Sequence, residues 1–192
     1  MSYICIMKKK GAKERIIEAA SHLFYFEGYN QTGINQILKE SGSSKDSMYR
    51  HFNSKEEIAV TYLKNRHIMW MGKLLDYTKP KTTSKEKIIA GFDYLDDWLT
   101  EVEFRGCGFQ NIICDLPKDQ QRIKDQVVLH KNELRETIHD ILKENDQYSV
   151  KEAEQLGDEI LVLMEGAIIL SQIQKNVWPI NSAKRTCSRL LD

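Results

Sequence analysis

Apolar residues recur every three or four positions along most of the chain, which is the spacing of one face of an α-helix. In residues 8–28, for example, Ile16, Ala20 and Phe24 share a face, while Lys13 lies on another. The same spacing predicts eight further helices, over residues 33–40, 44–52, 54–77, 84–104, 109–114, 119–144, 150–175 and 182–191. We find no strand-like alternation. The pattern therefore predicts an all-α fold of about nine helices.

Residues that begin and end helices stand between these segments. Gly28 suits a helix C-terminus, because glycine readily adopts a positive φ. Thr32 is expected to cap the second helix, and Ser54 with Glu57 three residues later forms a capping-box pattern. Pro179 is expected to break the chain before the last helix.

Basic residues are concentrated at the N-terminus. Residues 1–55 hold nine Lys and Arg against five Asp and Glu, although the 192-residue chain as a whole is neutral. This excess predicts that the N-terminal quarter meets a polyanion, with chance asymmetry as the alternative. The stretch Lys8–Lys10 is either a disordered tail or an arm that adds contacts to that polyanion.

The remaining composition excludes several classes of protein. The four cysteines, Cys5, Cys107, Cys114 and Cys187, form no C-x-x-C pair, which predicts a reduced, cytoplasmic protein. No stretch approaches 18 uncharged apolar residues, so no membrane partner is expected. Motifs for nucleophilic catalysis, phosphate binding and metal binding are absent from the sequence. We therefore expect neither an enzyme nor a bound metal or cofactor.

The second and third predicted helices are joined by a tight turn, residues 41–43, whose Gly42 can supply a positive φ. A helix, a glycine turn and a helix form the helix-turn-helix pattern, whose second helix enters the major groove. Short donors, cations and a tyrosine gather there, which suits phosphates and base edges. They are Ser43, Ser44, Lys45, Asp46, Ser47, Tyr49, Arg50 and His51.

A longer run of residues is more specific than the turn alone. The segment Lys13-Glu14-Arg15-Ile16-Ile17-Glu18-Ala19-Ala20 is followed by Leu23-Phe24, Gly28-Tyr29, Thr32, Ile34, Ile37, Gly42, Ser44-Lys45, Met48-Tyr49, His51-Phe52 and Ser54-Lys55-Glu56. Over residues 8–60 this run resembles, in residue type and spacing, the N-terminal DNA-binding domain of the TetR (tetracycline repressor) family. The rest of the chain agrees with the family only in the number and length of its helices.

The resemblance implies a three-helix DNA-binding domain, taken as residues 1–55, and a helical ligand-binding and dimerisation domain, residues 56–192. It also implies a homodimeric regulator, by default a repressor, that binds a palindromic double-stranded operator and is released by a small-molecule effector. By transfer onto matching positions, the residues expected at the DNA are Thr32, Gly33, Ser43, Ser44, Lys45, Ser47, Tyr49, His51 and Lys55.

Two positions depart from the family pattern. Ser43 stands where a small apolar residue is common, and Asp46 stands where Gly, Pro or Ala is common. We favour a structural role for Asp46, because an acidic residue stabilises a helix N-terminus. The alternative is that Asp46 accepts a hydrogen bond from a cytosine amino group and shapes the choice of operator.

Two surfaces are expected in the second domain. An apolar stripe on the last two helices is expected to form a four-helix bundle with a second copy, with packing inside one chain as the alternative. Its residues are Leu156, Ile160, Leu163, Ala167, Leu170, Cys187 and Leu190. A pocket for an apolar or aromatic effector is expected among aromatic and soft residues, each of which is alternatively a core residue. Its residues are Phe92, Trp98, Cys107, Phe109, Ile113, His130 and Met164.

Two other functions stay open at this point. Cys107 and Cys114 are seven residues apart and would share a helix face if their segment were helical, so a thiol redox sensor that binds DNA is one alternative. A helical interaction protein without DNA binding is the other.

Overall fold

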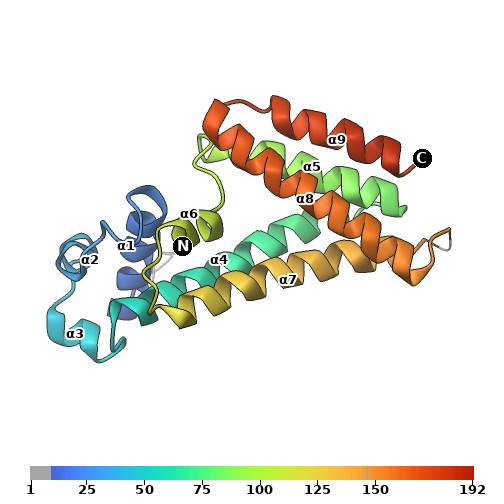
Figure 1. Ribbon diagram of the computed structural model, residues 1–192. Coiled ribbons are helices and arrows are strands. Elements are labelled where there is room, and N and C mark those ends of the chain that lie inside the picture. The colour runs from blue at the N-terminus through green and yellow to red at the C-terminus, as the bar shows by residue number, and fades with distance from the viewer. Residues whose placement is uncertain (1–9, 146) are drawn as a thin grey trace, which may run out of the picture.

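The computed structural model describes residues 10–145 and 147–192, and these residues form nine α-helices and no strand (Figure 1). The helices are α1 (Ala12–Phe26), α2 (Ile34–Ser41), α3 (Lys45–Tyr49), α4 (Lys55–Thr78), α5 (Ser84–Glu101), α6 (Gly108–Cys114), α7 (Gln121–Lys143), α8 (Val150–Gln174) and α9 (Trp178–Leu190). The all-α prediction is confirmed. Cys5, Lys8 and Lys9 lie outside the described residues. Among the described helices, none is long and apolar enough to cross a membrane.

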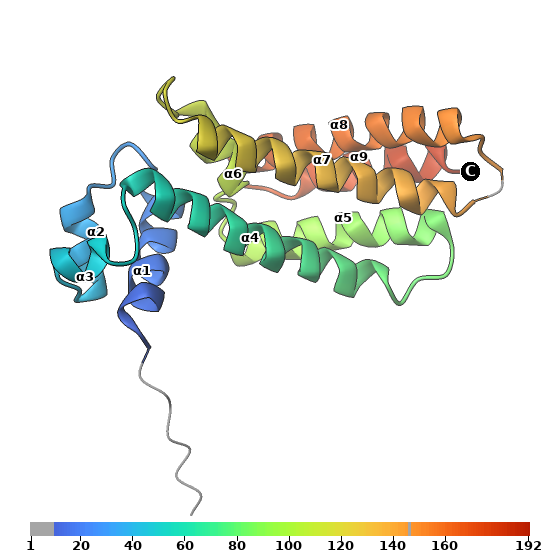
Figure 2. The same cartoon turned by 90° about the horizontal axis from the view of Figure 1, so that it is seen from below.

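The helices form two groups that α4 joins. Helices α1–α3, which we call the N-terminal unit, lie at one end of the molecule, and α5–α9 form the body (Figures 1 and 2). Helix α4 packs against α1 at one end and against α5 and α7 further along. In the body, α8 packs against α7 and α9, and α9 also packs against α5. One continuous helix therefore packs against both groups, and the buried apolar residues of the two groups form one cluster.

Apolar burial holds the N-terminal unit together. Helices α1, α2 and α3 contribute Ile16, Ile37 and Met48, respectively. All three side chains are fully buried and belong to one apolar cluster that also includes Phe52. Removing each such side chain from water stabilises the fold by roughly 1.5–3 kcal/mol. Met48 and Phe52 thus anchor the short helix α3, which has only five residues and would not form alone.

The start of α2 differs from the prediction. Its N-cap is Gly33, whereas Thr32 is fully buried and its Oγ1 donates to the Gly28 carbonyl oxygen at 2.8 Å. Because the chain is still extended at Gly33 (φ −90°, ψ 156°), the Thr32 hydroxyl lies behind the helix end and cannot reach its first amides.

The capping box at α4 is only half formed. The Ser54 hydroxyl accepts from the Glu57 amide at 3.1 Å, as predicted. The Glu57 carboxylate, however, accepts from the Asn53 amide at 2.8 Å instead of the Ser54 amide. Complete capping boxes stand at the starts of α5 and α8, where Thr83 pairs with Glu86 and Ser149 pairs with Glu152.

Helices α5 and α9 also depart from their predicted ends. Helix α5 ends at Glu101 rather than at residue 104, because Glu103 and Phe104 adopt left-handed backbone angles (φ 51° and 56°). Helix α9 begins at Trp178 and not at residue 182. Pro179 lies in its first turn, where the missing amide hydrogen costs no hydrogen bond.

The loop after α5 connects the body to the N-terminal unit. The Tyr25 hydroxyl on α1 donates to the Gly106 carbonyl oxygen at 2.8 Å, and the Arg105 guanidinium donates to the Phe26 carbonyl oxygen at 3.2 Å. On the body side, the Lys175 ammonium donates to the Phe104 carbonyl oxygen at 3.1 Å. The loop is thus held from both sides.

Two histidines, the buried His130 and the half-buried His67, meet where α4 packs against α7. Their Nδ1 atoms, on His67 and His130, are 3.0 Å apart, so one ring donates to the other. His67 Nε2 lies 2.8 Å from a Glu133 carboxylate oxygen, and the Phe109 ring stacks on His130 with centroids 3.8 Å apart. Burial, with the charges of Lys131, His67 and Arg66, lowers the pKa of His130 to about 3. His130 is therefore neutral near pH 7.

Two glycine substitutions are expected to change stability in opposite directions. Gly42 has φ 57°, so Gly42→Ala should lower the free energy of unfolding by about 1 kcal/mol. Gly72 lies inside α4, and a Cβ there would meet no atom within 4 Å. Gly72→Ala should raise the free energy of unfolding by about 0.5–1 kcal/mol. Urea denaturation at one fixed protein concentration measures both, and shifts of the same sign would contradict the assigned backbone conformations.

The buried histidine should make the protein less stable in mild acid. The unfolded chain takes up a proton near pH 6.5, whereas folded His130 does so only near pH 3. Its share of the stability is therefore present above pH 6.5 and is lost as the pH falls from 6.5 towards 3. The loss should reach about 2 kcal/mol at pH 5 relative to pH 7. In urea titrations, His130→Phe should flatten this dependence, while His22→Gln at an exposed position should leave it intact. An unchanged slope in His130→Phe would refute the assignment.

Candidate nucleic-acid interface and body cavities

The turn between α2 and α3 is fixed to α1 by one arginine. Gly42 ends α2 in the left-handed conformation (φ 57°, ψ 35°). The Arg15 Nε donates to the Ser41 carbonyl oxygen at 3.0 Å, and its Nη2 lies 3.5 Å from the Ser43 hydroxyl. Since Arg15 is on α1, the turn and the start of α3 are held at a defined place on the N-terminal unit.

Helix α3 presents polar side chains away from its anchor. The Ser44 hydroxyl caps the helix by accepting from the Ser47 amide at 3.1 Å. Lys45, Tyr49 and His51 are exposed, and nearly half of the Tyr49 side chain is accessible. Arg50 and Asp46 are exposed beside them, Gly33 is exposed at the start of α2, and Ser43 and Ser47 are half-buried. Most of the expected DNA-contacting residues therefore lie at or near the surface around α3.

Two residues expected at the DNA are placed differently. The Thr32 side chain is buried and turned towards Gly28, so it is not exposed to a phosphate. Lys55, at the start of α4, is half-buried, and its Nζ lies 4.2 Å from the centre of the Tyr29 ring. Burial lowers the pKa of Lys55. The sequence analysis did not anticipate this contact, although Tyr29 stands in the run that carries the family resemblance.

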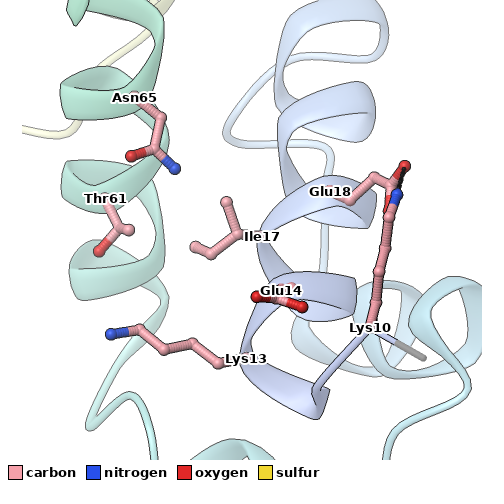
Figure 3. A pocket seen from close by; sticks show the side chains of 7 residues that line it. All are labelled: Lys10, Lys13, Glu14, Ile17, Glu18, Thr61 and Asn65. Atoms are coloured by element: carbon pink, nitrogen blue, oxygen red, sulfur yellow. Dashed lines mark hydrogen bonds and ion pairs between the residues drawn. The ribbon is translucent and has the colours of Figure 1, made fainter. Parts of the chain in front are cut away.

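A wide groove lies between α1 and α4 (Figure 3). Lys13 and Ile17 face it from α1, and Thr61 and Asn65 face it from α4. Its other lining residues are Lys10, Glu14 and Glu18, and Lys10 forms an ion pair with Glu18 at 2.6 Å. Two lysines and two glutamates balance, so the groove favours neither an anion nor a cation.

The body contains a narrow cavity between α4, α5, α7 and α8. Its volume is about 20 Å³, which is room for roughly one water molecule. It is lined by Trp70, Leu74, Thr78, Lys87, Ile88, Gly91, Leu95, Leu134, Thr137, Ile138, Ile141 and Met164. The lining is apolar except near Thr78, Lys87 and Thr137, and Lys87 pairs with Glu144.

The structure does not bring the predicted pocket residues together around this cavity. Of that set, only Met164 lines it. Phe92 is fully buried in the core, and Ile113 is exposed on α6. Cys107, Phe109 and His130 are buried near the α4–α7 contact, where Phe109 stacks on His130. Trp98 belongs to an aromatic cluster on the other side of Trp70. Core and pocket residues have the same chemistry, so composition alone did not separate them.

The apolar surface of α8 and α9 also differs in part from the prediction. Ile160, Ala167 and Cys187 are buried within the single chain, although Ala167 also lines the groove between α8 and α9. Their place in a dimer interface stays a prediction. Leu156 and Leu163 are half-buried, whereas Leu170 and Leu190 are exposed. Large apolar side chains that the prediction missed are exposed there as well, namely Val162, Ile169, Ile173 and Trp178. Helix α8 is apolar on two sides, so its sequence did not show which side faces inward.

A groove runs along the outer side of these two helices. It has a volume of about 240 Å³ and is lined from α8 by Val162, Leu163, Gly166, Ala167 and Leu170 and from α9 by Trp178, Pro179, Ser182, Ala183 and Thr186. A Cβ at Gly166 would meet no atom of the chain within 4 Å. We call the exposed apolar part of this surface, Val162, Gly166, Leu170, Ile173 and Trp178, the α8–α9 face.

Two cysteines on α6 are poorly placed for a disulfide. Cys107 is the buried N-cap of α6, and Cys114 is its exposed last residue. Seven residues of helix separate them by about 10 Å, which exceeds the ~7 Å limit between the Cα atoms of a disulfide. The Cys107 thiol lies 3.7 Å from the Lys131 ammonium, which forms an ion pair with Glu165 at 2.6 Å. A switch through a Cys107–Cys114 bond would require α6 to unfold.

Two family models match the chain. One, described as "Bacterial regulatory proteins, tetR family", matches residues 16–61. The other, described as "Transcriptional regulator LmrA/YxaF-like, C-terminal domain", matches residues 85–186, which is more than half of the chain.

Individual relatives agree with these models. The HTH-type transcriptional regulator LmrA of Bacillus subtilis is 30% identical over 180 residues, covering 88% of this chain and 90% of LmrA. A negative transcriptional regulator of a biofilm operon, IcaR of Staphylococcus epidermidis, is 25% identical over 130 residues, 68% of this chain and 66% of IcaR. The crystal structure of a TetR regulator from Legionella pneumophila superposes with a TM-score of 0.81 at 23% identity, covering 96% of this chain and 99% of that one, which shows the shared fold.

These relatives are transcriptional regulators and not enzymes, as the sequence predicted. The two family models match the parts of the chain that form the helix-turn-helix unit and the helical body, so sequence and structure point to the same family. The protein therefore belongs to the TetR family of DNA-binding transcriptional regulators.

Proposed function

We propose that this protein is a cytoplasmic, ligand-responsive repressor that binds a palindromic operator as a homodimer and leaves the DNA when a small molecule occupies its body. The observation that carries the proposal is the α3 surface, where polar side chains are exposed on a helix that Met48 and Phe52 anchor. Repression is supported by the name of IcaR, a negative regulator. We divide the chain into a DNA-binding domain, residues 1–55, and a body domain, residues 56–192, at the first turn of α4.

The α3 surface has the chemistry of a major-groove reader. Its serine and lysine side chains suit phosphates and base edges, and Tyr49 and His51 suit the sugar–phosphate backbone. We propose that the residues in contact with DNA are Gly33, Ser43, Ser44, Lys45, Ser47, Tyr49 and His51, with Lys55 at the margin. We leave Thr32 out of this set. We propose instead that it has a supporting role, because its hydrogen bond to the Gly28 carbonyl oxygen holds the chain before α2.

The α8–α9 face is proposed as the dimer interface. Val162 and Ile173 are about two-thirds exposed and Trp178 is half-exposed, which is unusual for large apolar side chains in one contiguous region of a single chain. Gly166 at its centre leaves space for close approach by a partner helix. Pairing two copies through α8 and α9 builds a four-helix bundle and gives the two α3 helices the spacing of about one DNA turn, ~34 Å.

The narrow body cavity is proposed as the effector site. It has room for only about one water molecule, so an effector must separate the helices that line it. Trp70 and Leu74 line it from α4, and α4 also packs against α1. An apolar or aromatic effector that wedges α4 away from α5 and α7 would therefore tilt the N-terminal unit and change the spacing of the α3 helices. By reciprocity, operator DNA must weaken effector binding by the same factor.

Selection from random duplex DNA tests the whole proposal. The purified protein should enrich a palindrome whose half-sites are about one helical turn apart. Failure to enrich any sequence, with a folded dimer in solution, would favour a helical interaction protein over a DNA-binding regulator.

Lys45→Ala should weaken operator binding in a salt-dependent way. A dimer that loses two phosphate contacts should show a slope of log K against log [salt] that is shallower by about 2. Lys151→Ala, which removes an equally exposed lysine from α8, should change neither affinity nor slope. Fluorescence anisotropy on the selected operator measures both variants. If the two variants have the same operator affinity and the same salt dependence, Lys45 does not contact the DNA.

Val162→Glu should dissociate the dimer. A carboxylate on each copy would be buried without a partner in the bundle, so the dimer dissociation constant should rise at least ~100-fold. Val128→Glu, at a similarly exposed valine on α7, is the matched control. Sedimentation velocity across protein concentrations gives both constants. A Val162→Glu protein that dimerises like the control would exclude the α8–α9 face.

A further inference from the structure

A second, separate pocket opens on the outer side of α4 and α5. It has a volume of about 160 Å³ and is lined by Lys73, Asp76, Tyr77, Tyr94, Asp97, Trp98 and Glu101. Trp70 stands between this pocket and the body cavity. Its ring lies 5.2 Å from Tyr94 and 5.9 Å from Trp98, and the same residue lines the body cavity. The two cavities are thus back to back across one tryptophan.

The floor of the outer pocket is aromatic. The Tyr94 and Trp98 rings stack at 27° with centroids 6.3 Å apart, and the Tyr77 ring lies 5.3 Å from Tyr94. Tyr94 is 2% exposed, yet its hydroxyl makes no hydrogen bond within the described part of the chain. Nor is this oxygen among the atoms sealed from solvent. Tyr94 thus lines the pocket and carries a hydroxyl oxygen that solvent can reach.

The rim of the outer pocket is negative. Asp76, Asp97 and Glu101 face a single cation, Lys73, whose ammonium lies 3.3 Å from a Glu101 oxygen. The Tyr77 hydroxyl donates to Asp97 at 2.7 Å, so one carboxylate is held in place at the aromatic floor. The hydrogen bond to Asp97, with the nearby charges of Asp97 and Glu101, raises the pKa of the lining residue Tyr77.

This combination selects a particular class of ligand. The faces of aromatic rings attract weakly hydrated cations, and carboxylates supply the counter-charge. Among the described residues, no three His, Cys, Asp or Glu side chains converge to hold a metal ion. The volume is below the ~300–1,000 Å³ of drug-sized sites, which favours a compact head group. We propose that the outer pocket binds a small organic cation such as a quaternary ammonium group.

Choline and 3,3-dimethylbutan-1-ol provide a matched pair of probes, because they have the same shape but only choline carries a charge. Titrations of the full-length protein without DNA, followed by NMR at the Trp98 indole signal, should show choline binding about tenfold or more tightly than the neutral alcohol. Because no operator is present, the result does not depend on the proposed DNA-binding function.

Charge-neutral variants locate the site. The double variant Asp97→Asn/Glu101→Gln keeps the shape of the rim and should weaken choline binding about tenfold without affecting the alcohol. Asp125→Asn/Glu136→Gln removes the same charge from exposed positions on α7 and should leave choline binding intact. Equal affinity for the two probes, an absent Trp98 response, or equal weakening by both double variants would each overturn the proposal.

Discussion

The fold depends on the packing of α4 against the N-terminal unit and the body at once. Near its start, Ile58 and Leu63 are fully buried, and further along Trp70 and Leu74 are buried in the body. Its 24 residues form one uninterrupted helix of about 36 Å. A helix of this length transmits a change of angle with little loss, because its backbone hydrogen bonds resist bending. A change in the angle of α4 within the body therefore also reorients the N-terminal unit.

Polar contacts between α4 and α7 restrict how α4 can move. The His67–His130 contact and the His67–Glu133 contact join α4 to α7 near the middle of both helices. Sliding either helix by one turn would separate the two rings and leave the buried His130 without its partner, and an unpaired buried polar group is costly. A pivot about this point keeps them paired. The histidines thus favour rotation of α4 over translation, which is the motion that changes the direction of the N-terminal unit.

The fold could be predicted from the sequence more completely than the sites could. Helical spacing located the nine described helices, and the motif around Gly42 located the helix-turn-helix of α2 and α3, because both signals are local. Thr32 was misplaced by one residue, since either Thr32 or Gly33 could begin α2 and only the backbone angle at Gly33 decides. A proline can either break a helix or stand in the first turn of one. Pro179 stands in the first turn of α9.

Sites built from several helices were less predictable. Ile160 and Val162 are two residues apart and equally apolar, yet one is buried in the chain and the other is exposed. Which side of α8 faces inward depends on α7 and α9, and no local pattern records that. The outer pocket escaped prediction for the same reason: Tyr77 and Asp97 are distant in sequence, and their hydrogen bond exists only because α4 packs on α5.

If the body cavity is the effector site, as proposed, its small volume has a kinetic consequence. At about 20 Å³ the resting form admits no effector, so binding waits for a spontaneous opening. If the open form makes up about 1% of molecules, the apparent affinity is about 100-fold weaker than the intrinsic one, and the observed association rate is lower in proportion. Sensitivity to an inducer is then set as much by how often the helices part as by how well the inducer fits. Substitutions remote from the cavity that loosen the packing of α4 would raise the apparent affinity for the effector, although they do not contact it.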